Sequence, residues 1–108
     1  MIVEIITDRP DLLIRRQRLR PGEASPWHTD ACERFTVVVS GDRLRIEFAD
    51  ASVAPLDVEV GPGLADWEQP EPRVHRAVNA GSEVYEEVVT FYRKAGEDPQ
   101  PTVDPNAI

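Results

Sequence analysis

The chain has 108 residues, enough for one domain with a small hydrophobic core, and with 41% hydrophobic and 30% charged residues it is not a disordered chain. A net charge of −8 argues against nucleic acid or an anionic membrane as a partner, because both attract basic surfaces. The single cysteine excludes an internal disulfide. Together with an amino terminus that lacks a basic leader, it predicts a cytoplasmic protein.

Short β-branched or alternating segments follow one another along the chain, separated by turn residues. Residues 12–20 carry many charges, and a helix is the alternative to a strand there. The cleanest alternation covers residues 43–48, where Leu44, Ile46 and Phe48 are expected to face inward. In chain order, strands are predicted over residues 2–7, 12–20, 35–40, 43–48, 53–60, 64–68, 73–79 and 83–94.

The proline-rich end of the chain, residues 96–108, is expected to form an extended tail. It is either loose or lies as an arm on the domain or on a partner subunit. Residues 1–95 then form the single domain. Many short strands, close turns and no confident helix predict an all-β sandwich or barrel.

One stretch, residues 21–34, gathers side chains that can bind metals. His28 and Asp30 are two residues apart, so on a strand they present to the same face. His75 lies far downstream on a separate alternating segment. If a barrel brings His75 opposite His28, the three residues form a two-histidine, one-carboxylate set that leaves positions open for substrate or oxygen.

Residues 22–41 resemble the first sequence motif of the cupin superfamily. Asp30 stands where the family has its second histidine. Arg34 stands at the position of the family's glutamate, with Glu33 one residue early. The residues that fall on the motif's spacing are Gly22, His28 and Gly41.

Residues 61–79 resemble the second cupin motif, with Pro72 in place of a glycine. The two motifs and the segments between them cover most of the chain. The resemblance implies a cupin-type jelly-roll β-barrel with the motif histidines in its mouth, in a family where a bound metal and dimer formation are common. The residues that match the second motif are Pro70, His75 and Asn79.

From the ligand types and the resemblance we expect a divalent metal ion (Fe, Mn, Zn or Ni) at His28, Asp30 and His75. Glu33 is a weaker candidate ligand. Arg34 cannot bind a metal, because a guanidinium has no lone pair to give. The alternative is that the two histidines are hydrogen-bonded barrel residues without a metal, and that Asp30 is a turn residue or a salt-bridge partner of Arg34.

Arg34 is expected either to grip an acid group of a substrate or to form an internal ion pair. It is a candidate catalytic residue, as is Glu33. Trp27 and Phe35 are candidate substrate-binding residues, with packing in the core or at the barrel mouth as the alternative. The last strand carries Glu86 and Glu87 side by side, and the sequence leaves open which of them faces the barrel.

These residues predict a protein that acts on a small, anionic organic molecule, as an oxygenase with iron or as an isomerase or lyase with a redox-silent ion. A homodimer is the expected assembly. The alternative function is a metal-free barrel that binds a small molecule as a sensor or carrier.

Overall fold

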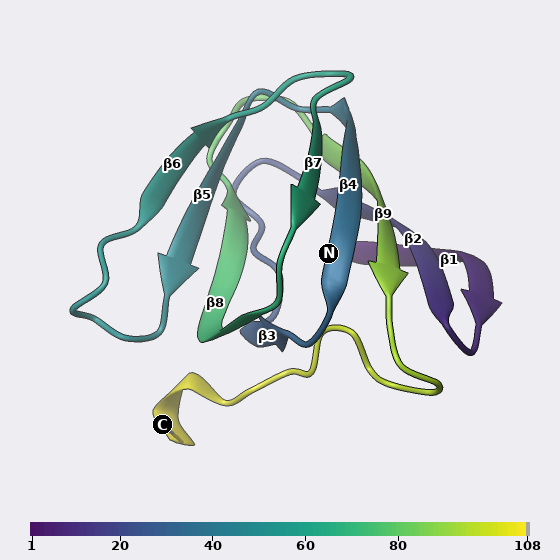
Figure 1. The fold of residues 1–108 in the computed structure, drawn as a ribbon. Helices are drawn as coiled ribbons and strands as arrows, with labels where there is room; N and C mark the ends of the chain where they lie inside the picture. The colour runs from purple at the N-terminus through teal and green to yellow at the C-terminus, as the bar shows by residue number, and fades with distance from the viewer. Residues whose placement is uncertain (108) are drawn as a thin grey trace.

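A computed structural model describes residues 1–107 as two antiparallel β-sheets that face each other (Figure 1). The five-stranded sheet has the order β1-β2-β9-β4-β7, and the four-stranded sheet has the order β3-β8-β5-β6. The elements are β1 (Ile2–Arg9), β2 (Leu12–Leu19), β3 (His28–Asp30), β4 (Glu33–Ser40), β5 (Arg43–Phe48), β6 (Leu56–Glu59), β7 (Ala65–Glu68), β8 (Glu71–Asn79), β9 (Tyr85–Tyr92) and the short 3-10 helix η1 (Pro105–Ala107).

This architecture confirms the predicted all-β fold. The charged segment 12–20 is a strand rather than a helix, because β2 pairs with β1 on one side and with β9 on the other. The strand predicted over residues 53–60 is shorter than expected. The Val53 amide closes a turn on the Asp50 carbonyl, and Pro55 has no amide to donate, so β6 begins only at Leu56.

The space between the sheets holds two buried apolar clusters and a cavity of about 650 Å³. Leu44, Ile46 and Phe48 line this cavity, as their alternation predicts. One cluster consists of Leu13, Cys32, Val89 and Phe91, and the other consists of Leu19, Val38, Leu44 and Tyr85.

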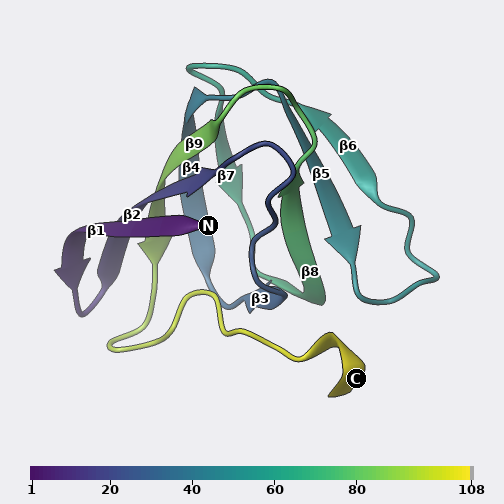
Figure 2. The ribbon, with the colours of Figure 1, turned by 180° about the vertical axis from the view of Figure 1, so that it is seen from behind.

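The ends of the chain run along the outside of this pair of sheets. β1 is the edge strand of the five-stranded sheet and pairs with β2. The tail after β9 crosses the end of the sheets beside β3, which Figure 2 shows from behind. Within residues 1–107, no helix is long and apolar enough to cross a membrane.

Asn79, a residue of the second cupin-like motif, fastens the end of β8 to its neighbours. Its side chain is 1% exposed, donates to the carbonyls of Leu19 (3.0 Å) and Glu83 (2.8 Å), and accepts from the Gly81 amide (3.0 Å). Asn79→Ala is expected to lower the free energy of unfolding by about 1–3 kcal/mol, because it leaves buried backbone groups without partners. Urea denaturation measures this loss.

The matched control is Asn106→Ala in η1, whose side chain is exposed. It should change the unfolding free energy by no more than about 0.5 kcal/mol. Equal effects of the two substitutions would contradict a fastening role for Asn79.

Candidate metal centre

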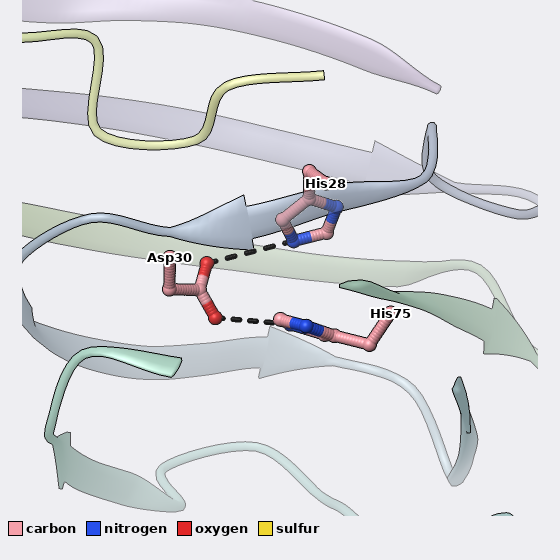
Figure 3. Close-up of side chains that lie close together, drawn as sticks. All are labelled: His28, Asp30 and His75. Atoms are coloured by element: carbon pink, nitrogen blue, oxygen red, sulfur yellow. Dashed lines mark ion pairs between the residues drawn. The ribbon is translucent and has the colours of Figure 1, made fainter. Parts of the chain in front are cut away.

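Two neighbouring strands of the four-stranded sheet bring the histidines together. β3 pairs with β8 in a register that sets His28 directly opposite His75, and the two ring centroids lie 4.6 Å apart. Asp30 follows His28 by two residues and faces the same side, as strand alternation requires. Figure 3 shows the three side chains converging from β3 and β8. The predicted trio therefore meets in one place, with potential ligand atoms all within 4.8 Å of one another.

Both imidazole rings are held in one tautomer. The Nδ1 atom of His28 lies 2.7 Å from the Pro26 carbonyl oxygen, and that of His75 lies 2.7 Å from the Arg73 carbonyl oxygen. A carbonyl can only accept, so each Nδ1 carries a proton and donates it. In the neutral rings the lone pair is then on Nε2, and both Nε2 atoms face Asp30. This is the arrangement in which metal-binding histidines are usually held.

Asp30 is a buried carboxylate, 3% exposed. Its Oδ1 lies 3.5 Å from His28 Nε2, and its Oδ2 lies 3.0 Å from His75 Nε2. Burial opposes the charge of Asp30. The two histidines, Arg34 and Gln100 outweigh it and hold the pKa of the carboxyl well below its usual range. The group is therefore ionised, and a potential ligand, at any pH near neutrality.

The contact with Asp30 also shifts the pKa of His75, but upward. Burial opposes protonation of its ring, but the Asp30 carboxylate and the Arg73 carbonyl outweigh it and raise the pKa of His75. In the part of the chain that the structure describes, Asp30 Oδ2 is buried and accepts no hydrogen bond of good geometry. When both rings are neutral, this buried carboxylate faces two imidazole lone pairs, which makes a site for a cation, so His28, Asp30 and His75 fit a divalent ion.

Arg34 forms an internal ion pair, one of the two roles expected for it. Its Nη1 donates to Asp30 Oδ1 at 3.2 Å, and its Nη2 pairs with Glu68 on the adjacent strand β7. Burial opposes the charge, but the two carboxylates outweigh it and raise the pKa of Arg34. The guanidinium is thus committed to the wall of the cavity and orients Asp30 from one side.

Three other candidate residues lie outside the cavity. Glu33 and Phe35 flank Arg34 on β4, so alternation turns them away from the interior. Glu33 accepts from Gln69 Nε2 at 2.9 Å, and the Phe35 ring lies 6.2 Å from the ring of Trp67. The ring of Trp27 lies beneath the Arg76 guanidinium at 4.4 Å. The structure does not bring Glu33, Phe35 or Trp27 to the trio.

The structure decides which of Glu86 and Glu87 on the last strand, β9, faces the barrel. Glu87 lines the cavity, where burial raises the pKa of its carboxyl, and it accepts a hydrogen bond from the Tyr85 hydroxyl at 3.0 Å. Glu86 faces outward and pairs with Arg18 at 2.5 Å. The register of β9 between β2 and β4 sets this choice.

Gln100 is the residue of the site that the sequence analysis missed. Its Nε2 donates to Asp30 Oδ1 at 2.9 Å and lies 3.4 Å from His28 Nε2. Arg15 Nη2 donates to its Oε1 at 2.7 Å, and because a guanidinium can only donate, this contact fixes which way the amide faces. The one signal for Gln100 in the sequence is its place between two prolines of the tail.

Backbone hydrogen bonds hold the tail against β3. The Ala31 amide donates to the Pro99 carbonyl at 2.9 Å, and the Thr29 amide donates to the Pro101 carbonyl at 3.2 Å. On the other side of Gln100, the Val103 amide donates to the Trp27 carbonyl at 2.9 Å. The tail is thus an arm lying on the domain, and it delivers the Gln100 side chain to the trio.

Gln100→Ala is expected to weaken the binding of a divalent ion about 10-fold, since partners that orient a ligand are typically worth 10- to 100-fold in affinity. Titration of metal-free protein with Zn²⁺ measures the change. Asn106→Ala, further along the same tail, serves as the control and should bind as the unmodified chain does. An unchanged affinity in Gln100→Ala would show that the amide does not orient Asp30.

Comparison with known proteins places this geometry in a fold class. No model of a protein family matches the sequence, and no curated protein matches it. Solved structures do match. A cupin domain from Bordetella pertussis Tohama I is 17% identical with a TM-score of 0.73, over 85% of this chain and 92% of that one.

Two further matches have the same architecture. A conserved protein with a double-stranded β-helix domain from Klebsiella pneumoniae is 19% identical, with a TM-score of 0.66 over 95% of this chain and 84% of that one. An RmlC-like cupin from Methanocaldococcus jannaschii is 18% identical, with a TM-score of 0.64 over 84% and 78% of the two chains. The protein has the cupin fold, a double-stranded β-helix, as its two sequence motifs predict.

Proposed function

We propose that this protein holds a divalent metal ion at His28, Asp30 and His75 and presents it to a small, anionic organic molecule in the barrel. The observation that carries the proposal is the buried Oδ2 of Asp30, which accepts no hydrogen bond within residues 1–107. It lies 3.0 Å from Nε2 of His75, and Nε2 of His28 lies 3.5 Å from the other oxygen of the same carboxylate. A cation satisfies all three groups together.

The preference for an anionic molecule follows from the charge of the ligands. Two neutral imidazoles and one carboxylate leave a divalent ion with a net positive charge toward the cavity, and this favours an anionic oxygen. Arg34 contributes by orienting Asp30 rather than by holding the molecule. Bound iron would supply oxygenase chemistry, and a redox-silent ion would supply the Lewis acid of an isomerase or lyase.

The direct test is metal content and metal titration of the chelator-treated protein with Fe²⁺, Mn²⁺, Zn²⁺ and Ni²⁺. We expect about one tightly bound ion per chain, lost in both His28→Ala and His75→Ala. Glu33→Ala is the control, because this carboxylate points away from the trio and its removal should leave binding unchanged. Stoichiometric metal that survives both histidine substitutions would place the ion elsewhere.

A metal-free ligand-binding barrel is the second candidate. It is favoured by Gln100, whose amide donates to Asp30 at 2.9 Å and approaches His28 Nε2 to 3.4 Å, so the chain itself partly satisfies the trio. This candidate predicts that no ion binds at any loading.

A further inference from the structure

The two walls of the cavity differ in chemistry. Strands β5 and β6 of the four-stranded sheet contribute an apolar wall, and the facing five-stranded sheet contributes a wall with several polar side chains. A bound molecule therefore meets hydrocarbon on one side and hydrogen-bonding groups on the other. The apolar wall includes Leu44, Ile46, Phe48 and Val58, and the polar wall includes Arg15, Gln17, Thr36 and Glu87.

Position along the strands separates the polar wall into two levels. Arg15 contacts Gln100 and so belongs to the level of the trio. Gln17 follows Arg15 by two residues on β2, which places it about 7 Å further along at 3.3–3.4 Å per residue. On the facing sheet Phe48 pairs with His75, and Ile46 pairs with Ala77. Gln17 thus faces the part of the apolar wall that lies beyond the metal ligands.

Gln17 is the unusual group at this second level. Its side chain is 7% exposed and lines the cavity, yet its Oε1 is buried and accepts no hydrogen bond from any of residues 1–107. A buried acceptor without a donor is unfavourable and calls for a partner. Such an acceptor selects for a molecule that carries an O–H or N–H group at the matching position.

A second acceptor stands beside it. Gln17 pairs with Glu87 across β2 and β9, and side chains paired in this way project together from the sheet. The Glu87 carboxyl lines the same cavity and accepts from the Tyr85 hydroxyl at 3.0 Å. Two oxygen acceptors therefore stand together opposite an apolar wall. The nearby cation Arg34 is committed to Asp30 and Glu68.

We propose that Gln17 and Glu87 form a second subsite, which recognises a hydrogen-bond donor at the far end of the bound molecule. The molecule is then a short carboxylate with an apolar middle and a terminal hydroxyl or ammonium group. The anionic end rests on the proposed metal function, whereas the contact with Gln17 does not require the metal. Glu87 decides between the two donors, because an ammonium favours the ionised carboxylate and a hydroxyl can bind the neutral carboxyl that burial favours.

The experiment compares matched probes on the metal-loaded protein. Butyrate, valerate and hexanoate are each titrated beside their ω-hydroxy and ω-amino derivatives. We expect the donor-bearing probe of the best chain length to bind about 5- to 10-fold more tightly than its parent acid, the size of one hydrogen bond. The preference should disappear in Gln17→Met, which keeps the length of the side chain without its oxygen.

Each outcome decides the subsite. A preference for the ω-amino probe that is reduced in Glu87→Gln identifies the donor as an ammonium, and equal binding of the ω-hydroxy probe in both proteins identifies a hydroxyl. Equal affinities of donor-bearing and parent probes, a preference that survives Gln17→Met, or no binding by any probe would overturn the subsite. If Gln17→Met does not fold, NMR of the unmodified protein takes its place as the test. The donor-bearing probe should then shift the Gln17 side-chain amide resonance, and the parent acid should not.

A metal-free arm separates this proposal from the metal site. Neutral diols, such as 1,4-butanediol and 1,5-pentanediol, are compared with their dimethyl ethers on chelator-treated protein. A diol preference that depends on Gln17, in a chain that binds no metal, would support the subsite and overturn the metal function. Metal binding at the trio together with equal binding of diols and ethers would support the metal function and overturn the subsite.

Discussion

Asp30→Asn is expected to lower the affinity for a divalent ion by more than about 100-fold, beyond the 10- to 100-fold typical of residues that only orient a ligand. The asparagine keeps the size of the side chain and an oxygen that can accept from Arg34 and Gln100, so the barrel remains folded. It removes the negative charge, and with it the one anionic ligand of the trio. Competitive titration with a chromophoric chelator measures the change for Zn²⁺ and Mn²⁺.

Glu33→Gln is the matched control for this substitution. It makes the same chemical change at a carboxylate that accepts from Trp67 and Gln69 outside the cavity, and it should bind metal as the unmodified chain does. If Asp30→Asn retains full affinity, Asp30 serves only as the partner of Arg34. The histidines would then have to bind the ion without it.

Phe91→Ala is expected to lower the free energy of unfolding by about 3–5 kcal/mol, the range for large-to-small changes at buried aromatic residues. Phe91 is 0% exposed and packs with Leu13, Cys32 and Val89 in one of the two interior clusters. Arg15 lies over its ring at 4.5 Å, and the same guanidinium donates to Gln100. Urea denaturation of metal-free protein measures the loss of stability.

Phe35→Ala is the control for Phe91→Ala, because it removes the same side chain from the outward face of β4. Because Phe35 is less buried than Phe91, Phe35→Ala should lower the free energy of unfolding by clearly less. Phe91→Ala should also weaken metal binding, since the support of Arg15 and hence of Gln100 is removed. Equal losses of stability in the two variants would mean that the cluster around Phe91 makes no special contribution to the stability of the barrel.

The sequence alone determined the elements whose evidence is local. The alternation over residues 43–48 determined which side chains of β5 face the interior, because successive residues of a strand must point to opposite faces. The spacing of His28 and Asp30 determined in the same way that they share a face. The resemblance of residues 22–41 and 61–79 to the two cupin motifs implied the cupin fold.

Tertiary structure decided everything that depends on pairing between distant segments. The register of β3 with β8 sets His28 opposite His75, and no local pattern in either segment contains that register. The register of β9 sends Glu87 inward and Glu86 outward. Which face of a strand is buried depends on what packs against it, so adjacent candidates such as Glu33 and Arg34 could not be separated from the sequence.

The clearest case is Gln100. It meets Asp30 from 70 positions along the chain, carried by a part of the proline-rich tail that belongs to no strand or helix. Three backbone hydrogen bonds to the β3 segment place it there, and such bonds leave no periodic signal because any residue except proline can supply the amide. The sequence therefore identified the candidate metal ligands by their chemistry, and the fold brought them together and decided which residues surround them.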